Sequence, residues 1–176
     1  VAVASKSRPN SEEEMTTRAQ LKAIRPTLLN AAAYYQDRSF GNSLLFARAF
    51  VDIVSMDIFE PTDFPRDAQF SQLAYYAASG SYNSADYRSA VKYFKEYLAA
   101  GSKDRRRDVY LFMAQACEKI NDFSLAQRTL DKAVLEYPGD YEILAKAINN
   151  CIDNGDNVKL QSYLTTALSM KPGDRS

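Results

Sequence analysis

Histidine is absent from the 176-residue chain, and this absence excludes much of the usual side-chain chemistry. Without it there is no Ser-His or Cys-His pair, no imidazole base and no imidazole ligand for a metal ion. No apolar run approaches the length of about 18 residues that a membrane-spanning helix needs. Lys plus Arg and Asp plus Glu both number 22, so the formal net charge of zero gives no global attraction to nucleic acid or to an anionic membrane.

Gly and Pro are also scarce, with six of each, and they stand between periodic segments, as is typical of a helical protein. Hydrophobic residues make up 46% and charged residues 25% of the chain, an ordinary composition for a globular protein. The length allows either one domain with a full core or one short array of repeats.

Identical residues recur at a spacing of 34 in the C-terminal part of the chain: Cys117 and Cys151, Leu130 and Leu164, Ala133 and Ala167, and Pro138 and Pro172. These coincidences at one period indicate an internal repeat, and 34 residues is the length of the tetratricopeptide helix–turn–helix unit. Proline cannot continue a helix, so we expect Pro138 and Pro172 each to follow the second helix of a repeat.

Residues 107–140 match the tetratricopeptide pattern W-x2-L-G-x2-Y, then A-x3-F, then P, in residue type. Its positions are held by Tyr110, Met113, Ala114, Cys117, Ala126, Leu130 and Pro138, with a turn at Asn121-Asp122-Phe123. Residues 141–174 form the next repeat, with its turn at Gly155-Asp156. Ile148 and Leu160 stand there in place of small residues, so we expect slightly wider helix packing.

Upstream, residues 71–104 show the same repeat pattern. A turn at Asp86-Tyr87 is followed by Ala90 and Phe94, which match A-x3-F. A fainter copy covers residues 28–56, where we expect Asn42-Ser43 to cap the second helix. Two Pro and two Phe lie in the insert at 57–66, which favours a packed, non-helical loop.

At the start of the chain, Ser11 to Glu14 are typical of a capping box, and we expect an N-terminal helical segment over 11–27 whose first helix runs to about Ile24. Pro26 then either starts a new helix or kinks the old one. Residues 1–10 show no periodicity, and we expect them to be mobile. Val1 stands in place of a start Met, so we expect either trimming or removal of a leader.

The chain thus resembles tetratricopeptide-repeat (TPR) proteins over about residues 28–174. More loosely, the order of "LLNAAAYY", a Pro-containing insert and "DYRSAVKYFKEYL" is similar to the exported TPR proteins of Bacteroidetes bacteria. The resemblance implies an all-α fold, a right-handed α–α superhelix of about four helix pairs plus an N-terminal helix. It also favours a location in the periplasm or cell envelope, with the cytoplasm as the other possibility.

Cys117 and Cys151 are candidates for a disulfide, a metal pair or a nucleophile, and we favour buried packing instead. They hold equivalent places on first helices whose axes lie about 8–10 Å apart, whereas a disulfide needs Cα atoms within about 7 Å. Asp153 to Asn157 superficially resembles a calcium loop but lacks the following spacing and the closing Glu. Glu12 to Glu14 are consecutive at a helix start, where the helix dipole favours acidic residues, so capping is preferred to catalysis.

Two further features could contact a ligand. The run Asp104 to Asp108, with three Arg between two Asp, could take phosphate, but we favour a solvated linker with local ion pairs. In the pairs Tyr34-Tyr35 and Tyr75-Tyr76 only one ring can face the core, so the other faces the groove or solvent. We expect no catalytic residue, no metal site and no cofactor.

In TPR proteins, partners contact the outward positions of the first helices, which line the concave face. Carried over residue by residue, the expected partner-binding residues are Gln72, Tyr75, Ser79, Tyr82, Asn83, Asp108, Leu111, Gln115, Glu118, Lys119, Glu142, Ala145, Asn149 and Asp153. The first repeat would add Leu29, Ala32 and Gln36.

Members that bind chaperone tails grip a C-terminal carboxylate with a Lys and an Asn one turn apart. The corresponding pairs here are Leu111 with Gln115 and Ala145 with Asn149, and Lys146 with Asn150 is one residue out of register. We therefore predict that this clamp is absent. The mixture of acidic, amide and aromatic groups suits an extended peptide or a helix of a partner protein.

The resemblance and the missing catalytic groups favour a non-catalytic scaffold for protein–protein interaction. Two alternatives stay open: a glycan-binding or assembly lipoprotein of the cell envelope, and the repeat region of a longer enzyme. The last helix also shows more apolar residues than its own repeat can cover. We expect either that the natural chain continues beyond Ser176 or that this end associates with another molecule, a second copy included.

Overall fold

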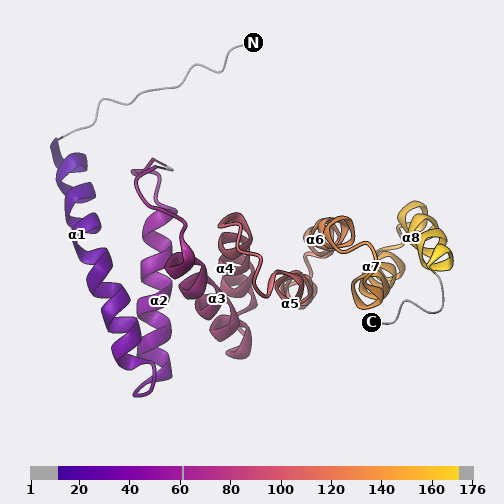
Figure 1. Cartoon of the computed structure of the whole chain (residues 1–176), viewed down its shortest axis with the longest axis horizontal. Coiled ribbons are helices and arrows are strands. Elements are labelled where there is room, and N and C mark those ends of the chain that lie inside the picture. The colour runs from indigo at the N-terminus through magenta and orange to yellow at the C-terminus, as the bar shows by residue number, and fades with distance from the viewer. Residues whose placement is uncertain (1–11, 61, 171–176) are drawn as a thin grey trace, which may run out of the picture. The chain divides into compact units, whose positions relative to one another are not determined.

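The computed structural model describes residues 12–60 and 62–170, and every regular element in these ranges is a helix. The helices are α1 (Glu12–Tyr35), α2 (Phe40–Val54), α3 (Ala68–Asn83), α4 (Tyr87–Ala99), α5 (Arg106–Lys119), α6 (Phe123–Glu136), α7 (Tyr141–Asn154) and α8 (Asn157–Ser169) (Figure 1). The fold is all-α, as the sequence predicts. Residues 1–10, Ser11 of the expected capping box, Pro61 of the insert and Pro172 lie outside the described residues.

The chain divides after Leu73 into two compact units, and this boundary falls inside α3. The first unit holds α1, α2, the insert and the start of α3. The second unit holds the rest of α3 and the helices α4 to α8, in which α5 packs on α4 and α6, and α7 packs on α6 and α8.

In the first unit α1 is one continuous helix, with Pro26 inside it. It covers residues of both the predicted N-terminal helix and the start of the predicted first repeat. Proline removes the N–H that would bond to the carbonyl of Lys22. Because Pro26 is exposed, water can satisfy that carbonyl, and the helix continues to pair with α2.

The N-terminus of α2 corrects the predicted cap at Asn42-Ser43. Ser39 is the N-cap, and its Oγ accepts the backbone N–H of Asn42 at 3.4 Å. Ser43 is buried, and its hydroxyl donates to the carbonyl of Ala32 in α1 at 2.9 Å. A serine that looks like a cap is therefore a contact between the two helices.

The insert between α2 and α3 contains no helix in its described residues, as expected for 57–66. Asp63 fastens it to α1, because its carboxylate accepts from Arg18 at 2.6 Å and from Lys22 at 2.5 Å. Hydrogen bonds from Lys22, the backbone of Glu60 and Arg18 hold the pKa of Asp63 well below its usual range. Phe64 of the same loop is buried, so the loop is packed.

Three turns of the second unit share one backbone arrangement: Ala85-Asp86, Asn121-Asp122 and Gly155-Asp156. The first residue of each has a positive φ, of 59°, 60° and 68° in chain order. The Asp then caps the next helix, accepting the N–H three residues on at 3.2, 3.0 and 3.1 Å. Its own N–H bonds back to the carbonyl five residues earlier, as in a Schellman motif. The predicted turns at Asn121-Asp122 and Gly155-Asp156 are confirmed, whereas the one predicted at Asp86-Tyr87 begins at Ala85, and Tyr87 is already the first residue of α4.

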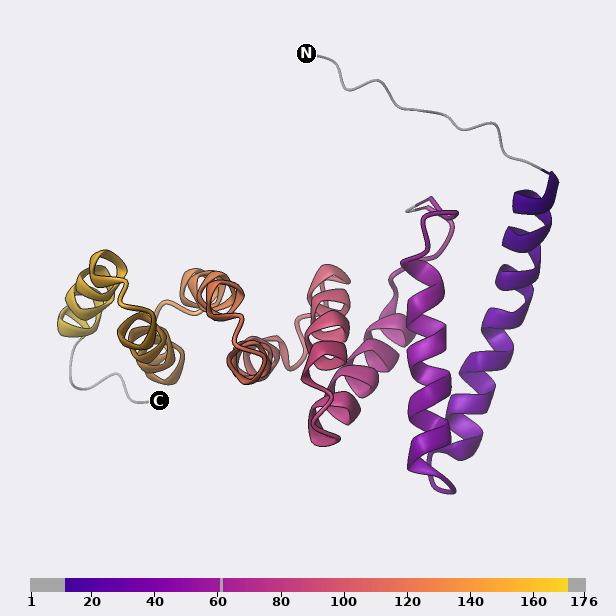
Figure 2. The ribbon, with the colours of Figure 1, turned by 180° about the vertical axis from the view of Figure 1, so that it is seen from behind.

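Small residues close the helix pairs, as predicted from the repeat. Ala114 of α5 and Ala126 of α6 have no exposed surface, and Leu130 fills the space beside them. Cys117 and Cys151 are also fully buried and are free thiols. Burial raises the pKa of Cys117 to about 12, so it remains a protonated packing residue. In both overall views α5 and α7 lie on one side of the second unit and α6 and α8 on the other (Figures 1 and 2).

The helix α8 differs from the other second helices because none of its residues is buried. Its polar contacts converge on Asp131 of α6, which accepts from Lys159 Nζ at 2.6 Å and from the Tyr163 hydroxyl. Gln127 donates to the same carboxylate at 2.8 Å. Burial would raise the pKa of Asp131, but the hydrogen bonds from Lys159, Tyr163 and Gln127 outweigh it and lower the pKa. The carboxylate of Asp131 therefore accepts the side-chain hydrogen bonds that join α8 to α6.

The shared turn predicts an effect of glycine that depends on position. Ala85 holds a left-handed conformation that costs an L-residue about 1–2 kcal/mol, and it is exposed. We expect Ala85→Gly to raise the free energy of unfolding by about 1 kcal/mol, measured by urea denaturation. Asn121→Gly is the control, because Asn tolerates this conformation and should change stability less. An equal gain for both variants would contradict the strain argument.

The fastening of α8 predicts different reactivities for the two thiols. Cys151 donates to Gln127, which itself donates to Asp131, and Cys151 should be uncovered when α8 opens alone. Cys117 lies in α5, which packs on α4 and α6 and, within the described ranges, not on α8. We expect Asp131→Asn to raise the maleimide labelling rate of Cys151 about tenfold and to leave Cys117 unchanged, measured by mass spectrometry. Asp153→Asn makes the same charge change at an exposed site and should have no effect. Equal acceleration at both thiols would mean that α8 opens only with the whole unit.

Candidate partner-binding face

Outward residues of α5 and α7 form two matching stripes in the second unit. In each helix they are spaced four, three and four residues apart, which keeps them on one side. The stripes are Asp108, Phe112, Gln115 and Lys119 in α5, and Glu142, Lys146, Asn149 and Asp153 in α7. All eight are exposed or partly buried, and we call them, with Tyr82 of α3, the first-helix face.

Phe112 is the apolar anchor of this face. It is 39% exposed, and its ring centre lies 5.6 Å from that of Tyr82 and 6.5 Å from that of Phe94. The Tyr82 hydroxyl donates to Gln115 Oε1 at 2.9 Å, so one tyrosine orients both neighbours. Burial, then the nearby Tyr87 and Glu118, raise the pKa of Tyr82, which keeps this donor protonated. A half-buried aromatic ring held in this way loses little entropy on binding.

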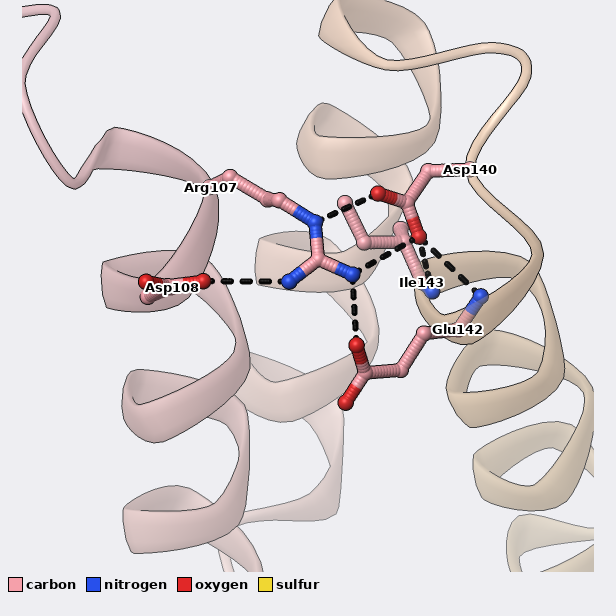
Figure 3. A network of polar contacts seen from close by, with 5 residues as sticks. All are labelled: Arg107, Asp108, Asp140, Glu142 and Ile143. Atoms are coloured by element: carbon pink, nitrogen blue, oxygen red, sulfur yellow. Dashed lines mark hydrogen bonds and ion pairs between the residues drawn. The ribbon is translucent and has the colours of Figure 1, made fainter. Parts of the chain in front are cut away.

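Arg107 joins the N-terminal ends of α5 and α7 (Figure 3). Its Nε and Nη2 donate to the Asp140 carboxylate at 2.5 and 3.2 Å, and Asp140 caps α7 through the N–H groups of Glu142 and Ile143. The same guanidinium reaches Glu142 at 2.5 Å and Asp108 at 3.0 Å. Three carboxylates against one guanidinium leave two negative charges uncompensated. The side chains of Glu142 and Asp108 are 66% and 53% exposed, so this charge faces solvent.

The out-of-register Lys and Asn are both engaged inside the protein. Lys146 Nζ donates to Glu118 at 3.0 Å. Asn150 is 1% exposed, and its Nδ2 donates to Gln127 at 2.6 Å. Neither side chain is therefore presented to a ligand carboxylate as a clamp would require.

The prediction that Leu111 contacts a partner is wrong. It is 7% exposed and packs with Tyr110, Ala133 and Ile143 in the core, so it does not lie on the face where the family register places it. The next residue, Phe112, faces outward instead. The hydrophobic pattern carries a signal for this shift, because two large apolar residues are adjacent and only one can enter the core.

The other expected contacts divide by exposure. Gln72, Asn83 and Ala145 are exposed, while Tyr75, Ser79 and Glu118 are partly buried. Gln72 belongs to the part of α3 in the first unit, and the rest belong to the second. In the first repeat Ala32 is buried, Leu29 is partly buried and Gln36 is exposed.

Both tyrosine pairs have one ring fixed by neighbours. Tyr75 lies 5.7 Å from the Tyr97 ring, with the Arg105 guanidinium 5.0 Å from its centre. Tyr35 stacks on Phe46 at 5.7 Å. Its neighbour Tyr34 is 57% exposed.

The basic run differs from the solvated linker that we expected. Arg105 pairs locally with Asp104 at 3.7 Å. Arg106, however, forms a bidentate ion pair with Glu136 of α6, with hydrogen bonds of 2.7 and 3.0 Å. Tyr110 also donates to Glu136, at 2.7 Å. Together with Arg107, these contacts tie α5 to α6 and α7 across about one repeat length, which local charge patterning could not reveal.

The described ranges contain no group of three or more His, Cys, Asp or Glu placed to hold a metal ion. In the same part of the chain, no helix has the length and apolar character needed to cross a membrane. The Asp153 to Asn157 segment is the end of α7 and the turn into α8, as turn chemistry predicts.

Comparison with known proteins establishes the fold. No protein-family model matches the sequence, and no curated protein matches it significantly. The structure is similar to a crystal structure of MamA, with a TM-score of 0.54 at 16% identity over 89% of this chain and 85% of that one. It is also similar to a Podosopora anserina putative kinesin light chain with nearly identical TPR-like repeats, with a TM-score of 0.50 at 14% identity over 94% and 95%. The protein is thus an all-α chain with a TPR-like repeat fold.

Proposed function

We propose that this protein is a non-catalytic scaffold that binds a peptide segment of a partner protein on the first-helix face. The observation that carries the proposal is Phe112, a 39%-exposed aromatic ring fixed between two other rings. Isolated exposed apolar residues are common, but the partly buried Tyr82 and the buried Phe94, whose rings lie against Phe112, distinguish an anchor from a chance exposure.

The surrounding groups indicate the chemistry of the peptide. A bulky apolar side chain would pack on Phe112 and Tyr82. The uncompensated negative charge around Arg107, one turn away along α5, favours a Lys or Arg beside that apolar residue. Gln115 keeps its amide N–H₂ and Asn149 is exposed, so both suit the backbone of an extended peptide.

A scaffold role also agrees with the state of the two thiols. Burial raises the pKa of both Cys117 and Cys151, so neither is a ready nucleophile. The looser resemblance to exported Bacteroidetes proteins supports placing this binding in the cell envelope.

A displayed library of random peptides, selected against the whole chain, tests the proposal. We expect the enriched peptides to share a bulky apolar residue next to a basic one. Their affinity, measured by fluorescence anisotropy, should fall about tenfold or more for Phe112→Ala. Asp108→Asn should weaken binding less and reduce its salt dependence.

Leu135→Ala is the matched control, because Leu135 is 81% exposed on α6, away from the first-helix face. It should leave the affinity for the peptide unchanged. Enriched peptides without a shared apolar residue, or equal losses for the two variants, would refute this assignment of the face.

A further inference from the structure

The outer sides of two second helices carry matching basic stripes. In α4 the residues are Arg88, Lys92 and Lys95, and in α6 they are Arg128, Lys132 and Leu135. Each set is spaced four and three residues apart, so each lies along one side of its helix. All six residues are exposed, and both helices pack on α5. We call these six residues the second-helix face.

The two stripes are close in space as well as alike in sequence. Burial raises the pKa of Cys117 in α5, and the positive charges of both Lys95 and Arg128 oppose that shift. A cation of α4 and a cation of α6 therefore act on the same buried thiol of α5.

The carboxylates of α6 do not balance this charge outward, because other contacts occupy them. Glu136 accepts from Arg106 and Tyr110 of α5, and Asp131 accepts from α8. Within the described residues, the side-chain hydrogen bond of Arg128 stays in its own helix, because it is donated to Ser124 at 2.9 Å. The outer sides of α4 and α6 thus carry five exposed cations and, in α4, one partly buried carboxylate, Glu96.

The form of this face distinguishes among anionic partners. Its cations are spread along two helices and do not converge on one point, which suits a surface of many mobile anions. Leu135 projects from the same stripe with 81% of its surface exposed, and an aliphatic side chain gains by entering a bilayer interface. Neither stripe carries an aromatic residue on which an unpaired base could stack.

We infer that the second-helix face of α4 and α6 binds reversibly to an anionic phospholipid bilayer. Each cation near such a surface contributes roughly fivefold in affinity, so a handful gives weak, salt-sensitive adsorption, and Leu135 adds an apolar contact. The opposite first-helix face stays available to a protein partner, so a bound chain would present that face to solvent.

Co-sedimentation of the whole chain with vesicles tests this inference. We expect binding to vesicles of phosphatidylglycerol and phosphatidylcholine in equal parts at low salt, a steep loss as salt rises, and no binding to phosphatidylcholine alone. Lys132→Glu should weaken vesicle binding by about twentyfold. Lys119→Glu makes the same charge change on the first-helix face and should alter vesicle binding less than twofold.

Leu135→Ser separates a bilayer from other polyanions, because it should weaken vesicle binding without changing the salt dependence. No vesicle binding at low salt, or equal losses for Lys132→Glu and Lys119→Glu, would overturn the inference. Two results would show that the partner is another polyanion and not a bilayer. One is unchanged vesicle binding by Leu135→Ser, and the other is that polyuridine or polyglutamate competes for the chain more strongly than vesicles do. Lys132→Glu should still bind the selected peptides, because Lys132 is not on the first-helix face. This measurement checks the proposed function independently, and the inference about the bilayer does not require that function.

Discussion

The turn between the two helices of a repeat fixes the arrangement of everything else in the second unit. At Ala85, Asn121 and Gly155 a single left-handed residue ends one helix, and the Asp that follows caps the next. The three turns share the Asp, whereas the left-handed residue before it is Ala, Asn or Gly. Since one residue more or less would rotate a helix by about 100°, the repeated turn keeps equivalent positions on equivalent faces. The matching stripes of α5 and α7 follow from that constraint.

The same constraint distributes the charges. Helix N-termini favour negative side chains, so Asp residues are used as caps, and one of them, Asp140, is also held by Arg107. Glu136 and Asp131 are bound by groups from neighbouring helices. Cations have no equivalent role at these turns, and those of α4 and α6 stay on the outer surface. A chain with zero formal net charge therefore has an acidic corner on one face and basic stripes on the other.

How much could be predicted depended on whether a feature is local or periodic. The helical class, the turns at Asn121 and Gly155 and the buried cysteines follow from the 34-residue period, because the same small and apolar positions recur in it. The Arg106–Glu136 and Arg107–Asp140 contacts join residues 30 and 33 positions apart, so no local charge rule detects them. Ser43 failed as a predicted cap because a buried serine can satisfy its hydroxyl across a helix pair. In the candidate site most expected residues are accessible, but the family register misplaced Leu111 because it does not record which of two adjacent apolar residues enters the core.

The register shift has a consequence for how a ligand would lie. The α7 residue equivalent to Phe112 is Lys146, which is paired with Glu118 of α5 at 3.0 Å. One repeat thus offers an aromatic ring where the next offers an ion pair. A peptide whose apolar side chain packs on Phe112 could not slide by one repeat, because that side chain would then desolvate the Lys146–Glu118 pair without replacing its hydrogen bond. Repeats with the same backbone therefore differ at one position, and this difference gives the face a direction that the fold alone does not supply.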